Sequence, residues 1–195
     1  MPLRMLSAPA SSVDLLSRPI AMRFAYYDKL APSRQRTYRR SDEIVTLGLP
    51  PGLVLAPIVE ALAAGLRADR RPDVQAACQS LIDALTRGYR VPDIRVRVLA
   101  TRPADGSGEL HGLYEPEDEG TLARISVWMR TAQKKNVVAF KTFLRTLIHE
   151  LCHHLDYELF ALEETFHTEG FYKRESVLVS ALIAQTPSLA APPSI

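Results

Sequence analysis

Four of the five histidines in this chain of 195 residues lie between positions 149 and 167. Two of them form the pattern His149-Glu150-Leu151-Cys152-His153. On a helix, residues four apart are separated by about 40° around the axis, so both imidazoles leave the same face and can bind one ion. Zn²⁺ accepts imidazole nitrogen readily. The spacing therefore predicts a zinc site, with Glu150 close enough to act as a general base without being a ligand.

The residues around this pattern predict the helix that the site requires. Between about Val137 and Phe160, apolar side chains gather on one side of a helical wheel, and His149 and His153 fall almost opposite. A buried structural pair would lie on the apolar side, so the arrangement favours a metal site over two solvated surface histidines. His154 falls within the apolar face and Cys152 between the two faces, and we expect both to be packed side chains.

A third ligand must come from beyond this helix, because catalytic zinc sites usually use three protein ligands. His167 is the best candidate, and the alternative is that it is a histidine of a surface loop. Glu175 is the second choice, and Glu163 and Glu164 also compete. Asp156 shares the ligand face and could accept a hydrogen bond from a ligand imidazole, although a solvated aspartate fits the pattern equally well.

Hydrophobic periodicity divides the rest of the chain into helices, then strands, then helices. We expect N-terminal helices over Tyr26–Arg40, Leu53–Ala68 and Pro72–Tyr89. Alternation with period two predicts strands near Ile94–Val98, Glu109–Glu115 and Leu122–Arg130. A last helix is expected over Phe171–Gln185. Segregated helices and strands favour an α+β fold, in which N-terminal helices precede a small, mostly antiparallel sheet, the active-site helix and a C-terminal helix.

Length and composition suit one domain, which we expect over residues 20–185, with flexible segments at 1–19 and 186–195. Within the domain, residues 20–90 form a helical part and residues 91–185 hold the site. No apolar run approaches the roughly 18–20 residues of a membrane span, and no signal peptide pattern is visible. Two cysteines give no disulfide framework. These features indicate a cytoplasmic protein without membrane attachment.

The charge is distributed unevenly along the chain, although the net charge is only +2. Residues 1–100 carry 15 basic and 9 acidic side chains, a sum of +6, and residues 101–195 carry 9 basic and 13 acidic ones, a sum of −4. A basic N-terminal half could contact nucleic acid or another acidic partner. The alternative is an ordinary arginine-rich solvated surface.

The histidine pattern, followed later by His167 and Phe171, resembles the SprT-like (Spartan-type) zinc metallopeptidases. Those proteins carry HExxH on a helix and a third zinc histidine in a short HGxxF-type segment. The spacing from His167 to Phe171 matches that segment, while Thr168 stands where the glycine would be and Gly170 follows two places later. The resemblance covers roughly residues 91–180, which would be the catalytic part of a zincin-like domain. Family members often act on proteins bound to DNA, and bacterial relatives often add a cysteine-rich zinc ribbon. This chain has no CxxC pair, so it lacks that module, and the resemblance gives less support to DNA targeting.

The resemblance implies zinc ligands at His149, His153 and His167, with Glu150 as general base. It also implies that the Leu122–Arg130 strand lies along the cleft, where zincins commonly bind the substrate backbone as an added strand.

The resulting hypothesis is a zinc-dependent metallopeptidase that hydrolyses peptide bonds in a peptide or protein substrate. A further donor should stabilise the oxyanion, and Tyr172 and Arg174 are candidates, although each could be an ordinary helix-surface residue. Two alternatives stay open. One is a non-catalytic zinc-stabilised module that binds nucleic acid or protein through the basic N-terminal half, and the other is a metal-dependent hydrolase acting on a non-peptide bond.

Overall fold

The helix that carries the histidine pattern is α4, Phe140–Glu158, and it lies where the sequence predicts it. The structure is a computed structural model that describes residues 24–105, 108–118 and 120–186. The predicted flexible segments, residues 1–19 and 186–195, therefore lie outside the described residues except for Thr186. One face of α4 is apolar and fully buried, and it consists of Phe143, Leu144, Leu147, Ile148, Leu151 and Leu155. This face packs into the main hydrophobic core, as the wheel predicts.

The sheet against which α4 packs has three strands in the order β1-β5-β4. These are β1 at Ile94–Thr101, β4 at Gly112–Glu115 and β5 at Ala123–Arg130. β4 pairs with β5 in antiparallel fashion, but the longer ladder between β1 and β5 is parallel. The sheet is therefore mixed, and the expectation of a mostly antiparallel sheet is wrong for that ladder.

A small separate hairpin explains this topology. The predicted strand Glu109–Glu115 is split, because Gly108–Glu109 (β3) pairs with Ala104–Asp105 (β2) and only Gly112–Glu115 joins the main sheet. The hairpin turns the chain back after β1, and the loop after β4 turns it again. As a result β5 runs parallel to β1 without a helical crossover.

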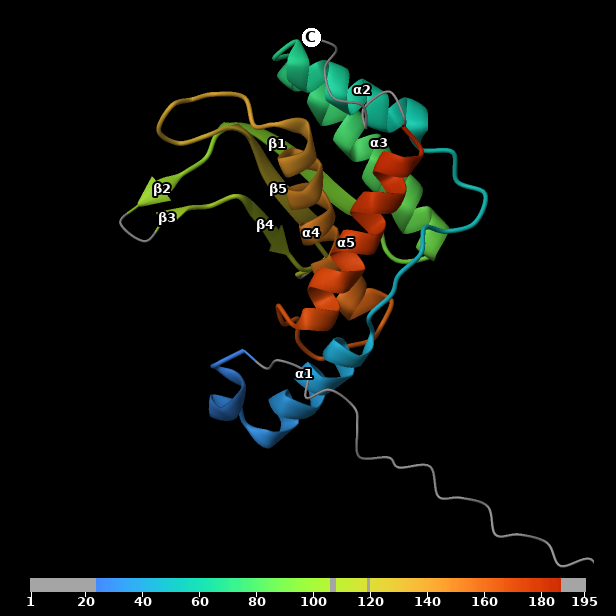
Figure 1. Cartoon of the computed structure of the whole chain (residues 1–195), viewed down its shortest axis with the longest axis vertical. Coiled ribbons are helices and arrows are strands. Elements are labelled where there is room, and N and C mark those ends of the chain that lie inside the picture. Colours follow the sequence, from blue (N-terminus) through green and yellow to red (C-terminus); the bar gives the residue numbers. More distant parts are fainter. Residues whose placement is uncertain (1–23, 106–107, 119, 187–195) are drawn as a thin grey trace, which may run out of the picture.

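Two N-terminal helices, α2 (Ala56–Arg67) and α3 (Arg71–Tyr89), pack together, and α3 lies along the outer side of β1 (Figure 1). Gln75 and Gln79 of α3 hydrogen-bond the main chain of β1 as a neighbouring strand would. The Gln75 side chain accepts from Val98 N at 2.7 Å and donates to Val96 O at 2.9 Å. The free edge of β1 is closed in this way, and β4 forms the opposite edge of the sheet.

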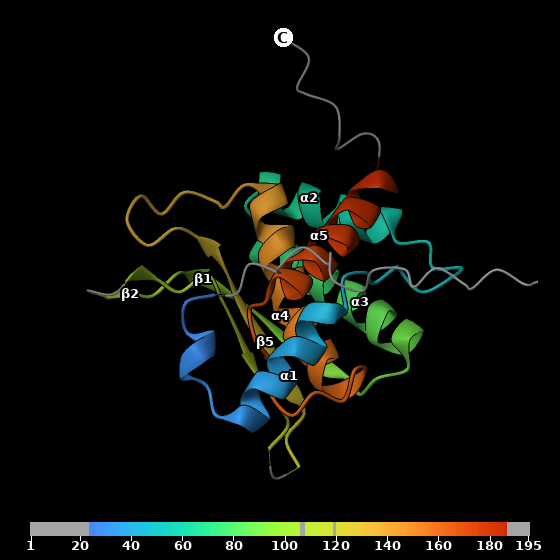
Figure 2. The ribbon, with the colours of Figure 1, turned by 60° about the horizontal axis from the view of Figure 1, so that its bottom comes forward.

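The remaining helices lie beside α4 and at its histidine-bearing end. Helix α5, Glu169–Ala184, packs along α4, and α1, Pro32–Glu43, lies against the start of α5 (Figures 1 and 2). The sequence predicts one helix over Tyr26–Arg40, but a short 3-10 turn (Tyr27–Lys29) comes first and the chain is extended at Leu30 and Ala31. Pro32 accounts for the break, since a residue before proline avoids the helical region.

The observed elements confirm the α+β class. The main core draws on α2, α3, α4, α5 and the three longer strands, so residues 20–90 and 91–185 contribute to one core. A second, small cluster of Tyr27, Tyr38 and Phe166 joins the α1 region to the loop between α4 and α5. Among the described residues, no helix combines the length and the apolarity that a membrane crossing requires.

Candidate metal centre

Three imidazoles meet at one point between α4 and the loop that leads to α5. His167 Nε2 lies 3.0 Å from His149 Nε2 and 3.1 Å from His153 Nε2. Nitrogens that share one tetrahedral zinc ion lie about 3.3 Å apart, since each Zn–N bond is about 2.0–2.1 Å long. The three histidines therefore form a group that could hold a metal ion. Among the described residues, no fourth histidine, cysteine or carboxylate belongs to this group.

The other ring nitrogens indicate where the protons are. His149 Nδ1 lies 2.8 Å from Glu175 Oε2, a carboxylate oxygen that can only accept. His153 Nδ1 lies 2.8 Å from Thr165 Oγ1, and that hydroxyl donates to Asp156 at 2.9 Å, so it accepts from the imidazole. Both rings thus carry a proton on Nδ1 and present a lone pair at Nε2. A proton on His167 Nε2 could serve only one of these two lone pairs, whereas a cation among the three nitrogens would be bound by all of them.

The protonation equilibria agree with this assignment. Burial lowers the pKa of His153 to about 3, with a contribution from the neighbouring His149 and His167. Burial likewise lowers the pKa of His167, while Glu175 opposes the change. A metal binds neutral imidazole, so both rings are in the ligand form at neutral pH.

Glu150 lies beside the three histidines but points to the other wall of the cleft. Its side chain is nearly buried, with 6% exposed. Burial raises the pKa of Glu150 to about 7, while the electrostatic interaction with His149 and a main-chain hydrogen bond from Tyr114 act in the opposite direction. Gly112 lets β4 approach this closely, because a Cβ at that position would lie 2.3 Å from Glu150 Oε1.

A cleft of about 710 Å³ contains the histidines and Glu150. One wall is the polar face of α4, and the other is formed by His111 and by Gly112, Leu113 and Tyr114 of β4. The prediction that the Leu122–Arg130 strand lies along the cleft is wrong, because β5 is the central strand and β4 is the edge strand. Sequence alternation identifies strands but not their order.

The loop between α4 and α5 is held by α1, and this contact places His167. Arg34 forms a bidentate pair with Glu164, and Thr37 Oγ1 donates to Glu163 at 3.1 Å. Both glutamates therefore face α1 and neither reaches the metal group. At the start of α5, Asp42 Oδ1 accepts from Gly170 N at 2.9 Å.

Sequence reasoning missed this role of α1, and also the part played by Thr165. The one sequence feature that could have indicated the close approach of α1 is the glycine at position 170. A Cβ there would lie 2.5 Å from Asp42 O. Some basic residues of α1 are engaged within the chain as well. Arg39 hydrogen-bonds the Tyr27 hydroxyl, and Arg40 reaches the carbonyls of the turn after α4.

Glu175, the second choice for the third metal ligand, and Arg174, a candidate oxyanion donor, both lie outside the metal group. Glu175 is buried and binds His149 Nδ1 through one oxygen and Arg145 through the other, so it supports a ligand and does not join the metal group. Arg174 is fully buried, pairs with Asp156 at 2.7 Å and donates to the carbonyls of Ser41 and Ile44. It does not line the cleft, so its assignment as a candidate oxyanion donor is wrong.

Four further predictions concern residues near the pattern. His154 is buried between Tyr114 OH at 3.1 Å and Pro92 O at 3.0 Å, which confirms it as a packed, hydrogen-bonded histidine. Cys152 is a buried free thiol, as expected. Tyr172 lines the cleft with its ring stacked on that of His167 at 5.8 Å. Asp156 supports His153 through Thr165 and not directly.

The chain was compared with known proteins in three ways. No protein-family model matches it, no curated protein matches it, and no solved structure matches it. The resemblance to SprT-like metallopeptidases therefore rests on the histidine pattern and on the segment from His167 to Phe171.

Proposed function

We propose that this protein is a zinc-dependent metallopeptidase. The observation that carries the proposal is the convergence of three imidazole Nε2 atoms on one point in an open cleft, with the nearly buried Glu150 carboxylate in the same cleft. Catalytic zinc sites use three protein ligands and leave one position open, whereas structural sites are usually closed by a fourth. The three-histidine group, without a fourth protein ligand among the described residues, fits the catalytic type.

Zinc is the metal we propose, because neutral imidazole suits it and the three donors leave room for substrate. When bound, Zn²⁺ supplies Lewis acidity that activates water and polarises a carbonyl group. Glu175 and Thr165 hold the rings of His149 and His153 in the ligand orientation, and such outer hydrogen bonds fix the tautomer of the ligand.

Glu150 is the proposed general base. Its carboxylate takes the proton from the attacking water and delivers it to the leaving amine, the role that a carboxylate beside the ligand pair performs in peptide hydrolysis. Tyr172 is the remaining candidate donor to the oxyanion, since its side chain lines the cleft. Edge strand β4 contributes Gly112, Leu113 and Tyr114 to the opposite wall, so an extended substrate in the cleft would have an edge strand with which to pair.

The substitution Glu150→Gln tests this proposal. It removes the basic carboxylate but leaves all three histidines, so zinc content should stay at the wild-type value while hydrolysis of a quenched-fluorescence peptide or of casein is lost. Equal activity in the variant and the wild type would remove the general-base assignment. Absence of peptide hydrolysis by the zinc-loaded wild type would overturn the proposed function.

Two further parts of the proposal concern location and partners. A cytoplasmic location is supported by two unpaired cysteines, Cys78 and Cys152. Binding of nucleic acid through the basic N-terminal half stays a prediction, and it requires an affinity that falls steeply as salt is raised. Salt-insensitive or absent binding would refute it.

A further inference from the structure

Arg145 is a cleft residue to which the proposed reaction gives no role. It is the only arginine or lysine among the described residues that line the cleft. The two acidic side chains that line it, Glu150 and Glu175, are both buried, whereas the Arg145 side chain is 52% exposed. Arg145 is therefore the charged side chain in this part of the cleft that a ligand can reach most readily.

The position of Arg145 relative to the metal group follows from helix geometry. It precedes His149 by four residues, so it lies on the same face of α4, about 6 Å closer to the start of the helix. An extended peptide advances about 3.3 Å per residue. A substrate bound over the histidines and running toward the start of α4 would thus bring a group within about two residues of the cleaved bond to Arg145.

The guanidinium group is held in place but retains free donors. Its Nη1 binds Glu175 Oε1 and lies 3.4 Å from Ser176 Oγ. No described residue accepts a hydrogen bond from its Nε or Nη2. Arginine presents five N–H donors in a rigid planar fork that matches a carboxylate. The neighbouring cleft residues on α4, Thr142 and Thr146, are neutral, so Glu175 is the one described carboxylate that pairs with this guanidinium group.

We propose that Arg145 forms a carboxylate-binding subsite, which selects peptides with a carboxylate within about two residues of the cleaved bond. This inference rests on the proposed function. The carboxylate can belong to an aspartate or glutamate side chain or to the C-terminus of the peptide. Both sources offer the same planar pair of oxygens, so the experiment must separate them.

The test uses one quenched-fluorescence peptide in which single positions on both sides of the cleaved bond carry Glu, Gln or Lys. Each peptide is made with a free C-terminus and with a C-terminal amide. A hydrogen bond to a charged group contributes enough for at least about a tenfold preference. We therefore expect kcat/KM for one Glu position, or for the free acid, to exceed that of its neutral counterpart by at least about tenfold.

Variants assign the preference to Arg145. In Arg145→Gln the ratio between the carboxylate peptide and its neutral counterpart should fall to about one, and Arg145→Lys should retain part of it. Lys141→Gln is the matched control, because Lys141 is an exposed residue of α4 outside the cleft, one turn earlier, and should leave the ratio unchanged. Since Arg145 also contacts Glu175, zinc content is measured in each variant, and a purely structural role would lower both rates without changing their ratio.

The outcomes are distinguishable. A preference for Glu at one position identifies an acidic side chain, and a preference for the free acid alone identifies the chain terminus. A wild-type ratio near one, or a ratio that survives Arg145→Gln, would overturn the subsite. If no peptide is cleaved, the proposed function fails by itself, and the same peptides are then compared by fluorescence anisotropy. Carboxylate-selective binding that is lost in Arg145→Gln would still support the subsite, and unselective or absent binding would refute it.

Discussion

Replacing Arg174 with methionine should destabilise the fold strongly, because this side chain is the centre of a buried polar network. Arg174 has no exposed surface, and it pairs with the equally buried Asp156 at 2.7 Å. It also donates to the carbonyls of Ser41 and Ile44 at 2.6 Å each. The network therefore ties α4 and α5 to the end of α1. Methionine fills similar volume but supplies none of these donors.

The expected magnitude follows from the groups that lose their partner. Removing one member of a buried ion pair costs about 3–5 kcal/mol, because the other charge stays buried. For a chain of this length, each kcal/mol lowers the melting temperature by about 2–4 °C, which gives a fall of roughly 6–20 °C. Burial raises the pKa of Asp156 and Arg174 lowers it, so the variant should move that carboxyl further toward its protonated form.

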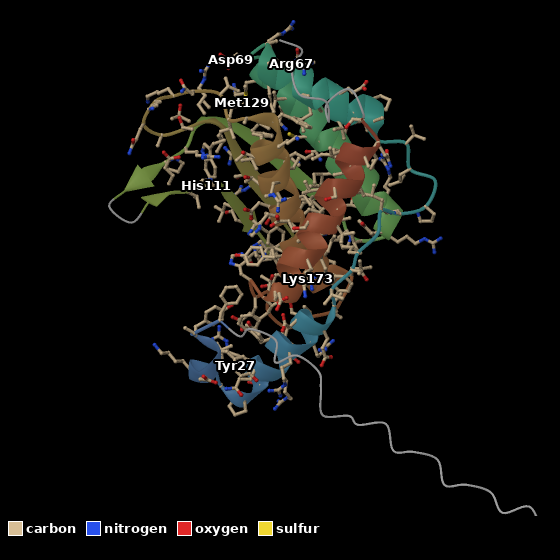
Figure 3. All side chains as sticks on the ribbon, in the orientation of Figure 1. Tyr27, Arg67, Asp69, His111, Met129 and Lys173 are labelled. Atoms are coloured by element: carbon tan, nitrogen blue, oxygen red, sulfur yellow. The ribbon has the colours of Figure 1, made fainter. Side chains whose placement is uncertain are left out.

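Denaturant and thermal unfolding measure this effect, and Lys173→Met is the matched control. Lys173, labelled in Figure 3, is the preceding residue of α5, and its side chain is 52% exposed in a pair with Glu169. A surface change of this kind should stay within about 0.5 kcal/mol of wild type. If Arg174→Met unfolds like the wild type and the control but loses peptidase activity, Arg174 acts on the substrate and the structural account of this residue is wrong.

Three other predictions concern the site and the core. Gly112→Ala should lower kcat/KM by about a hundredfold or more with zinc retained, because its Cβ would displace the Glu150 carboxylate. Gly48→Ala is the control, since a Cβ at that position meets no atom within 4 Å, and equal activity in the two variants would refute the contact. Thr165→Val should weaken zinc binding about 10- to 100-fold, since His153 loses its outer hydrogen bond; competition with a chelator measures this, and an unchanged affinity would contradict it. Cys78 and Cys152 should react with a thiol reagent only on unfolding, because burial shields both and raises the pKa of each thiol; rapid labelling of the native protein would count against the packing.

Local patterns were enough to predict the part of the site that lies on one helix. The wheel of α4 separates an apolar face from the face that bears His149 and His153, and this depends only on residues within one segment. The assignments of His154 and Cys152 to packed positions came from the same periodicity. His167 was a choice among candidates, and the structure brings it to the group while placing Glu175 behind His149.

The features that could not be predicted depend on contacts between distant segments. The order β1-β5-β4, which puts β4 at the cleft, is a property of strand pairing and not of alternation. The position of Arg174 could not be predicted either, because nothing in its own segment indicates that Asp156 and the end of α1 surround it. The hydrogen bonds between α1 and the segment that leads into α5 likewise join residues far apart in the chain.

The most direct test of the zinc centre is the metal content of the purified chain, measured by mass spectrometry after removal of loosely bound ions. The wild type should contain one zinc ion per chain. His167→Ala should lose it or bind it more weakly by orders of magnitude, because two imidazoles remain of the three that converge. A wild type that takes up no zinc, or a His167→Ala variant with unchanged content and affinity, would contradict the three-histidine site.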